Sequence, residues 1–124
     1  MTVKPLELFG SSIHLRRGGE ISTGREPAQD GWRLQAVHAK TGDDVRADHW
    51  QAHPDAEKIV SCLVGKIRLY LRPERPGEPE EEIRLTAGTA AIVPRGRWHR
   101  IALDIPSDVL AVTLPGDGRL ERVR

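Results

Sequence analysis

The segment GTAAIVPRGRWH at residues 88–99 constrains the fold of this chain more than any other part of the sequence. It holds two glycines, a proline and a histidine at the spacing G-x5-P-x-G-x2-H. The apolar run at residues 90–93 predicts a buried strand, and Pro94 with Gly96 predicts a tight turn after it. We therefore expect His99 to open the next strand, with its side chain directed into a barrel.

Short apolar or alternating runs, separated by clusters of Gly, Pro and Asp, follow one another from Trp32 onward. This pattern is typical of an all-β sandwich or barrel. Ile67, Leu69 and Leu71 alternate with polar neighbours and predict a strand with one buried face, after a hairpin turn at residues 64–66. The run at 59–64 is apolar on both faces, which favours a central strand. Further strands are expected at 34–39, 82–85, 100–103 and 109–114, and one at 6–15 in the less regular N-terminal part.

Length, charge and cysteine content limit the class of protein. A chain of 124 residues fits one domain, 1–124, which buries roughly two-thirds of the surface of its unfolded chain. Lysine and arginine number 19 against 18 acidic residues, a net charge of +1, so no global field attracts nucleic acid or an anionic membrane. The single cysteine, Cys62, excludes an intrachain disulfide. No apolar stretch is typical of a signal peptide or a membrane span, so we expect a cytoplasmic protein.

The spacing at residues 88–99 resembles the second sequence motif of the cupin superfamily. That resemblance implies an all-β cupin fold, which is a double-stranded β-helix or jelly-roll barrel. The segment around Trp50, His53 and Pro54 is similar to that of small single-domain bacterial cupins. Because such proteins commonly form homodimers that cover exposed strand edges, the resemblance also implies a homodimer. A small-molecule ligand inside the barrel is the expected partner.

Metal-binding cupins carry a first motif that resembles G-x5-H-x-H-x3or4-E-x6-G and supplies two histidines and a glutamate. His99 would add the fourth ligand. Aligned without gaps, this motif places Gln51 and His53 at the histidine positions and Lys58 at the glutamate position. A shift of one residue brings in Glu57 instead. The implied metal ligands are then Gln51, His53, Glu57 and His99, a mixed set of nitrogen and oxygen donors that suits Fe, Mn, Ni or Zn.

Strand periodicity bears on which of two neighbouring side chains faces the barrel. If Val60 faces inward, Lys58 is in phase with it and Glu57 is not, unless a bulge exchanges them. An inward lysine disfavours a divalent cation and would act as a base or as an amine donor to an anionic ligand. An outward lysine leaves Glu57 to complete the metal site. His49, two positions before Gln51, is a further candidate ligand.

Three functions remain open at this point. The resemblance implies a metal-dependent oxygenase or isomerase that acts on a small oxygenated substrate, with the metal as Lewis acid and template. A metal-free cupin would bind a small metabolite as a sensor or carrier, with Lys58 and Gln51 as recognition groups. A metal-free isomerase or cyclase would use a histidine as general base. Lys58 is a further candidate catalytic residue. The fold alone does not choose among them.

Overall fold

The structure is a computed structural model that describes residues 2–24, 30–116 and 118–123. Strands dominate it. In the described part of the chain, no helix has the length and apolar character needed to cross a membrane. In chain order the elements are η1 (Leu8–Gly10), β1 (Ser12–Leu15), β2 (Ile21–Thr23), β3 (Trp32–Ala39), η2 (Gly42–Val45), β4 (His49–Ala52), β5 (Lys58–Val64), β6 (Lys66–Leu71), β7 (Glu81–Thr86), β8 (Thr89–Val93), β9 (His99–Leu103), β10 (Ser107–Thr113) and β11 (Arg119–Arg122).

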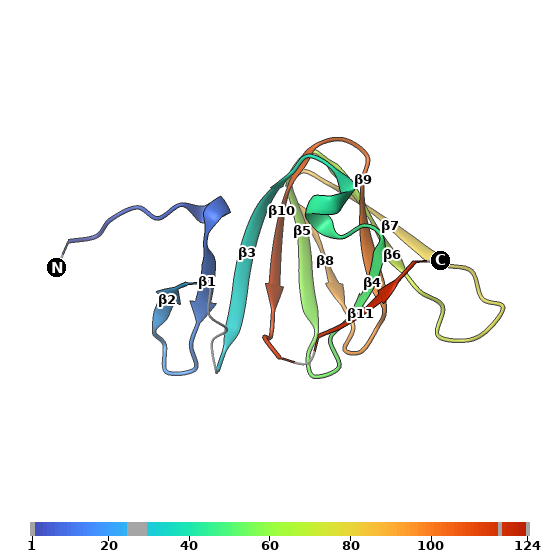
Figure 1. Ribbon diagram of the computed structural model, residues 1–124, viewed down its shortest axis with the longest axis horizontal. Helices are drawn as coiled ribbons and strands as arrows, with labels where there is room; N and C mark the ends of the chain where they lie inside the picture. The colour runs from blue at the N-terminus through green and yellow to red at the C-terminus, as the bar shows by residue number, and fades with distance from the viewer. Residues whose placement is uncertain (1, 25–29, 117, 124) are drawn as a thin grey trace.

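The strands form two antiparallel sheets that enclose the core (Figure 1). One sheet has six strands in the order β2-β1-β3-β10-β5-β8, and the other has five in the order β11-β4-β9-β6-β7. The hairpin of β1 and β2 extends the six-stranded sheet beyond the closed part of the fold, at the left of Figure 1. The predicted all-β jelly-roll architecture is confirmed.

Buried apolar side chains from both sheets meet between them. On β5 the buried positions are Lys58, Val60 and Cys62, and their neighbours are exposed or half-buried. This is the period-2 alternation of a strand with one buried face, and β6 follows it too. The cluster that forms the core consists of Ala39, Val45, Val60, Cys62, Ile67, Leu69, Leu71, Leu85, Val93, Ile101 and Val109.

The turn at residues 64–66 joins the two sheets and is not a hairpin. β5 pairs with β10 and β8 in the six-stranded sheet, whereas β6 pairs with β7 and β9 in the five-stranded one. The expected hairpin is therefore wrong. The chain turns a corner of the sandwich here, and the same local turn signal serves both kinds of connection.

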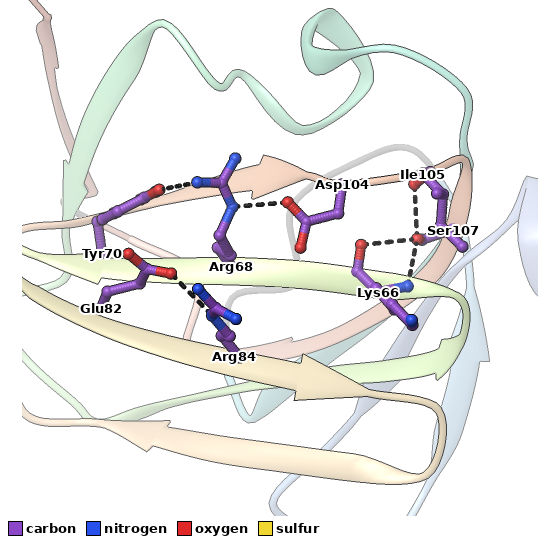
Figure 2. Close-up of polar contacts among 8 residues, drawn as sticks. All are labelled: Lys66, Arg68, Tyr70, Glu82, Arg84, Asp104, Ile105 and Ser107. Atoms are coloured by element: carbon purple, nitrogen blue, oxygen red, sulfur yellow. Dashed lines mark hydrogen bonds and ion pairs between the residues drawn. The ribbon is translucent and has the colours of Figure 1, made fainter.

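Gly65 makes this corner possible because of its backbone conformation and its close contact with Ser107. Its φ is +99°, and a Cβ at this position would lie 2.2 Å from the Ser107 Oγ. The buried Ser107 Oγ accepts a hydrogen bond from the Lys66 amide at 3.0 Å and lies 2.8 Å from the Ile105 carbonyl oxygen, as Figure 2 shows. Only glycine combines this φ with so close an approach.

Most of the predicted strands are confirmed. The expectations at 34–39, 82–85, 100–103 and 109–114 correspond to β3, β7, β9 and β10, with ends that differ by one or two residues. The predicted strand at 6–15 is only half right, because η1 occupies its centre and only β1 is extended. β11 was not predicted, since all four of its residues are exposed and give no alternation. Its pairing with β4 alone defines it as an edge strand.

Candidate functional site

Three neighbouring strands of the six-stranded sheet bring two cationic side chains to one end of the inner face. Arg33 of β3 lies opposite Thr113 of β10 in the strand register. On the other side of β10, Val112 pairs with Ile59, which puts Lys58 beside Thr113. Arg33, Thr113 and Lys58 thus form one row across the sheet, and all three line a cavity.

The five-stranded sheet supplies neutral polar groups that face this row. Gln51 of β4 and His99 of β9 are register partners. His53 follows directly after β4, and the Gly96 amide donates a 2.9 Å hydrogen bond to its carbonyl oxygen. The turn at Gly96, with φ +74°, therefore fixes the chain that carries His53 as well as the start of β9.

A side-chain contact in the site joins the two sheets. The Lys58 Nζ lies 3.2 Å from the His99 Nε2 and 3.5 Å from the Gln51 Oε1. The His99 Nδ1 lies 3.1 Å from the carbonyl oxygen of Arg97, to which it donates when it carries the ring proton. In that tautomer Nε2 is a free acceptor, and the Lys58 ammonium donates to it. Lys58 is 5% exposed and His99 0%, so the contact is shielded from water.

Burial sets the charge states of these groups. It lowers the pKa of His99 to about 3 and that of His53 to about 4, and the positive charge of Lys58 adds to both effects. Burial, followed by the charge of Arg33, lowers the pKa of Lys58 to about 8. At neutral pH both imidazoles are therefore neutral, while the lysine is an ammonium.

The second histidine faces the first across the site. The ring centroids of His53 and His99 are 6.0 Å apart, with 34° between the ring planes. Within the described residues the His53 Nε2 is buried and has no hydrogen-bond partner. The Arg33 Nε is in the same condition. Among the described residues, the site therefore contains a buried imidazole nitrogen and a buried guanidinium N–H without partners.

The cavity beside these groups has a volume of about 340 Å³, at the small end of the range for small-molecule sites. Its wall is polar where Arg33, Lys58, Gln51 and His53 lie. The remaining lining residues are Gln35, Val37, Asp44, Val45, Arg46, Ile101, Val109, Ala111, Thr113, Gly118, Arg119 and Leu120.

The structure brings together most, but not all, of the residues that the sequence singled out. Gln51, His53 and Lys58 line the cavity, and His99 is buried behind Lys58. Glu57 is exposed and does not line the cavity, because it alternates with the inward Lys58. Its expected place among the metal ligands is corrected accordingly. The His49 Nδ1 is hydrogen-bonded to the Asp48 Oδ1 at 2.8 Å, and His49 also lies outside the cavity lining.

Sequence reasoning missed Arg33. The residue lies in the strand that was predicted from 34 onward, one position before its expected start, and an isolated arginine at a strand end is normally solvent-exposed. Its phase with Gln35 and Val37, which also line the cavity, was the available signal.

The donor set does not fit a divalent metal. Among the described residues, no group of three or more His, Cys, Asp or Glu is placed to hold one. The predicted carboxylate is outside the cavity, and the Lys58 ammonium occupies the Nε2 lone pair of His99. A metal bound to that nitrogen would lie about 2.1 Å from it, almost in contact with a second cation.

Comparison with solved structures places the fold. A cupin-2 domain protein from Shewanella frigidimarina is 16% identical, with 73% of this chain and 76% of that one covered and a TM-score of 0.48. A hydroquinone 1,2-dioxygenase in complex with Cd²⁺ and 4-hydroxybenzonitrile is 16% identical, with 76% and 68% covered and a TM-score of 0.53. The cysteine peptidase Peruvianin-I from Thevetia peruviana latex is 15% identical, with 75% and 56% covered and a TM-score of 0.56. The chain thus spans little more than half of the latex protein.

The chain is a cupin-fold protein, and the resemblance of residues 88–99 is confirmed at the level of the fold. No protein-family model matches the chain, and no curated protein is significantly similar to it. Since a dioxygenase and a cysteine peptidase have similar folds, a function for this chain has to be argued from its own site.

Proposed function

We propose that this protein is a metal-independent cupin whose cavity binds a small organic molecule. The observation that carries the proposal is the 3.2 Å contact between the Lys58 Nζ and the His99 Nε2. Lys58 stands at the position where the metal-binding motif has a glutamate, so a fixed cation of the protein itself takes the place of a carboxylate ligand. The cavity beside it then recognises a ligand by hydrogen bonding and charge, without coordination to a metal.

Electrostatics supports this proposal. Two unit charges 4 Å apart interact by about 4 kcal/mol at the effective dielectric of a protein, and a divalent ion beside the ammonium would double the repulsion. In the described part of the chain, no carboxylate forms an ion pair with Lys58 that would offset it. The buried ammonium is itself accommodated by two neutral acceptors, the His99 imidazole and the Gln51 amide oxygen.

A metal-dependent oxygenase or isomerase is the competing function. The unused Nε2 of His53, in a ring 6.0 Å from that of His99, favours it. The complex of a dioxygenase of similar fold with Cd²⁺ also supports a divalent ion such as Fe, Mn, Ni or Zn. This function requires Lys58 to leave His99, so the two proposals make opposite predictions for metal content.

Elemental analysis separates the two functions. Untagged protein is purified without added metal or chelator, and its metal content per chain is compared with that of His99→Ala. We expect well below one equivalent in both proteins. About one equivalent of metal in the wild type, lost in His99→Ala, would overturn the metal-independent proposal and support the oxygenase or isomerase.

We further propose that two copies of the chain associate through the outer face of the six-stranded sheet. Ile59 of β5 and Ile92 of β8 are register partners on this face and are 39% and 67% exposed. Val112 of β10 lies on the other side of Ile59. Two exposed isoleucines, continued by the half-buried Val112, form an apolar row that favours burial against a second copy.

The outer face of the five-stranded sheet has the opposite character. Figure 2 shows Arg68 of β6 between Tyr70 of the same strand and Asp104 in the turn after β9, with the Arg68–Asp104 ion pair at 2.7 Å. Light scattering coupled to size-exclusion chromatography is expected to give a dimer for the wild type and a monomer for Ile92→Lys. A wild-type monomer would contradict the proposed association.

A further inference from the structure

We infer that the ligand of the cavity is a small carboxylate with an apolar remainder, and that its carboxylate lies against the row formed by Arg33, Thr113 and Lys58. This inference rests on the proposed metal-independent binding function and adds the chemical class of the ligand. It is carried by three features of the cavity: uncompensated positive charge, unused hydrogen-bonding groups, and a change from polar to apolar along the strands.

Positive charge at the polar end has no acidic counterpart in the described residues. Lys58 is bonded to an imidazole and an amide, and neither carries a negative charge at neutral pH. No ion pair involves Arg33 in the described chain. Asp44 is the one acid among the described lining residues, and it accepts hydrogen bonds from the backbone amides of Lys40 and Thr41 instead. Buried cations in proteins are normally paired, so an anionic ligand would complete this end of the cavity.

The groups left without partners match a carboxylate. The Arg33 Nε–H is a buried donor without an acceptor, and guanidinium N–H groups bind planar carboxylates in a bidentate manner. The Lys58 ammonium has three N–H donors, of which two are directed to His99 and Gln51. Its third donor and the Arg33 fork are therefore available to two oxygens of one ligand group. His53 lines the same cavity from the side of the other sheet, and its Nε2 is buried without a partner in the described residues.

The strand register makes this wall of the cavity less polar away from this row. The next row along the two strands pairs Gln35 of β3 with Ala111 of β10. The row after that pairs Val37 with Val109. Because side chains on one face of a strand recur every second residue, these pairs form successive rows on the same wall. Ile101, two residues beyond His99, and Val45 of η2 add apolar side chains at the far end, where Asp44 and Arg46 also line the cavity. A ligand that fits this wall has a charged head and a short hydrocarbon or aromatic body.

Isothermal titration calorimetry with matched acids and amides tests the inference. The probes are butyrate and benzoate, their neutral counterparts butyramide and benzamide, and inorganic phosphate. The variants are Lys58→Met and Arg33→Met. The matched controls are Lys66→Met and Arg84→Met, which change exposed residues of the same types. Circular dichroism confirms that each variant is folded before titration.

We expect a carboxylate to bind and its amide to bind at least tenfold more weakly, because charge-assisted hydrogen bonds are lost. Lys58→Met and Arg33→Met each lower carboxylate affinity about tenfold or more, while the control variants leave it unchanged. Equal binding of acid and amide, or tighter binding of phosphate than of benzoate and butyrate, would overturn the carboxylate class and leave the metal-independent cavity standing.

Absence of binding by every probe also overturns the carboxylate inference. If elemental analysis of the same preparation finds about one equivalent of metal, the proposed function fails with it. If no metal is present, only the ligand class fails. Calorimetry and elemental analysis of one sample therefore distinguish a failure of the carboxylate inference from a failure of the proposed function.

Discussion

The corner turns and the cavity wall of this protein relate to the cupin pattern in opposite ways. At the corners, Gly65 and Gly96 stand where the motifs require glycine, and each has a positive φ. On the wall, Gln51 and Lys58 stand where the metal-binding motif has a histidine and a glutamate. The contrast teaches that the positions that form the fold and the positions that form a metal site are separable, although they alternate within the same short segments.

The energetic reasons for the two regions differ. Gly65 is required by sterics, since a Cβ there would lie within 3 Å of three Ser107 atoms, whereas Gly96 is favoured by its φ of +74° alone. A residue on the cavity wall can carry any charge that its neighbours stabilise. In this chain the neutral imidazole of His99 stabilises the Lys58 ammonium. The following predictions test this separation, first at the wall.

Restoration of the glutamate has the largest expected effect. Lys58→Glu replaces the buried cation with a carboxylate beside His53 and His99, so the three groups form a nitrogen and oxygen set that suits a divalent ion. Titration of the variant with Zn²⁺ or Mn²⁺ is expected to show about one equivalent bound per chain. The wild type and a Lys66→Glu control are expected to show none at the same concentrations. Binding of about one metal ion per chain by the wild type would show that the cavity wall retains a metal site, as the corners retain their glycines.

Gly65→Ala tests the corner. The clash with Ser107 and the left-handed backbone are expected to lower the free energy of unfolding by about 3 kcal/mol or more. Gly88→Ala is the matched control, because Gly88 has a similar φ of +84° but nothing within 4 Å of an added Cβ. Its expected cost is about 1 kcal/mol. Urea denaturation of both variants gives the difference, and equal costs would show that the Ser107 contact contributes nothing.

Lys58→Met tests how much the buried ammonium lowers the free energy of unfolding. Burial lowers the lysine pKa from 10.5 to about 8, which corresponds to a destabilisation of at most about 3 kcal/mol below pH 8. Because the variant also deprives His99 and Gln51 of a donor, we expect a net stabilisation of about 1 kcal/mol at pH 7.

The pH dependence of this difference identifies its cause. Between pH 8 and 10.5 the folded wild type releases the Lys58 proton while the unfolded chain keeps its own, so the wild type gains stability and the advantage of Lys58→Met shrinks. Besides Lys58, the charged or titratable groups that face it are His53, His99 and Arg33. A constant advantage from pH 7 to 10 would contradict the assigned cause.

Acid is expected to act on the two histidines, of which His99 is fully buried and His53 only partly. Their folded pKa values of about 4 and 3 lie below the ordinary 6.5, so the unfolded chain binds protons first as the pH falls. Stability is therefore full above pH 6.5 and declines toward pH 4. Urea midpoints of the wild type and of His53→Gln at pH 7 and 4.5 measure the effect, and the variant should lose less stability than the wild type.

The sequence was a good guide wherever a local pattern had a local cause. The alternation of Ile67, Leu69 and Leu71 predicted β6 because a strand with one buried face has period 2. The phase of Lys58 with Val60 and Cys62 made an inward lysine one of two alternatives for the same reason, and in the structure all three are buried. By contrast, β11 left no such pattern, because an exposed edge strand is held by its pairing with β4.

What the sequence determined by itself is most of the strands from residue 32 onward, the corner glycines and the presence of a lysine at a ligand position. Only the tertiary structure decided what that lysine does. Lys58 and His99 are 41 residues apart and lie on different sheets, and Arg33 reaches the same row through two strand pairings. Contacts of this kind depend on sheet register and on the packing of one sheet against the other, which no local pattern encodes.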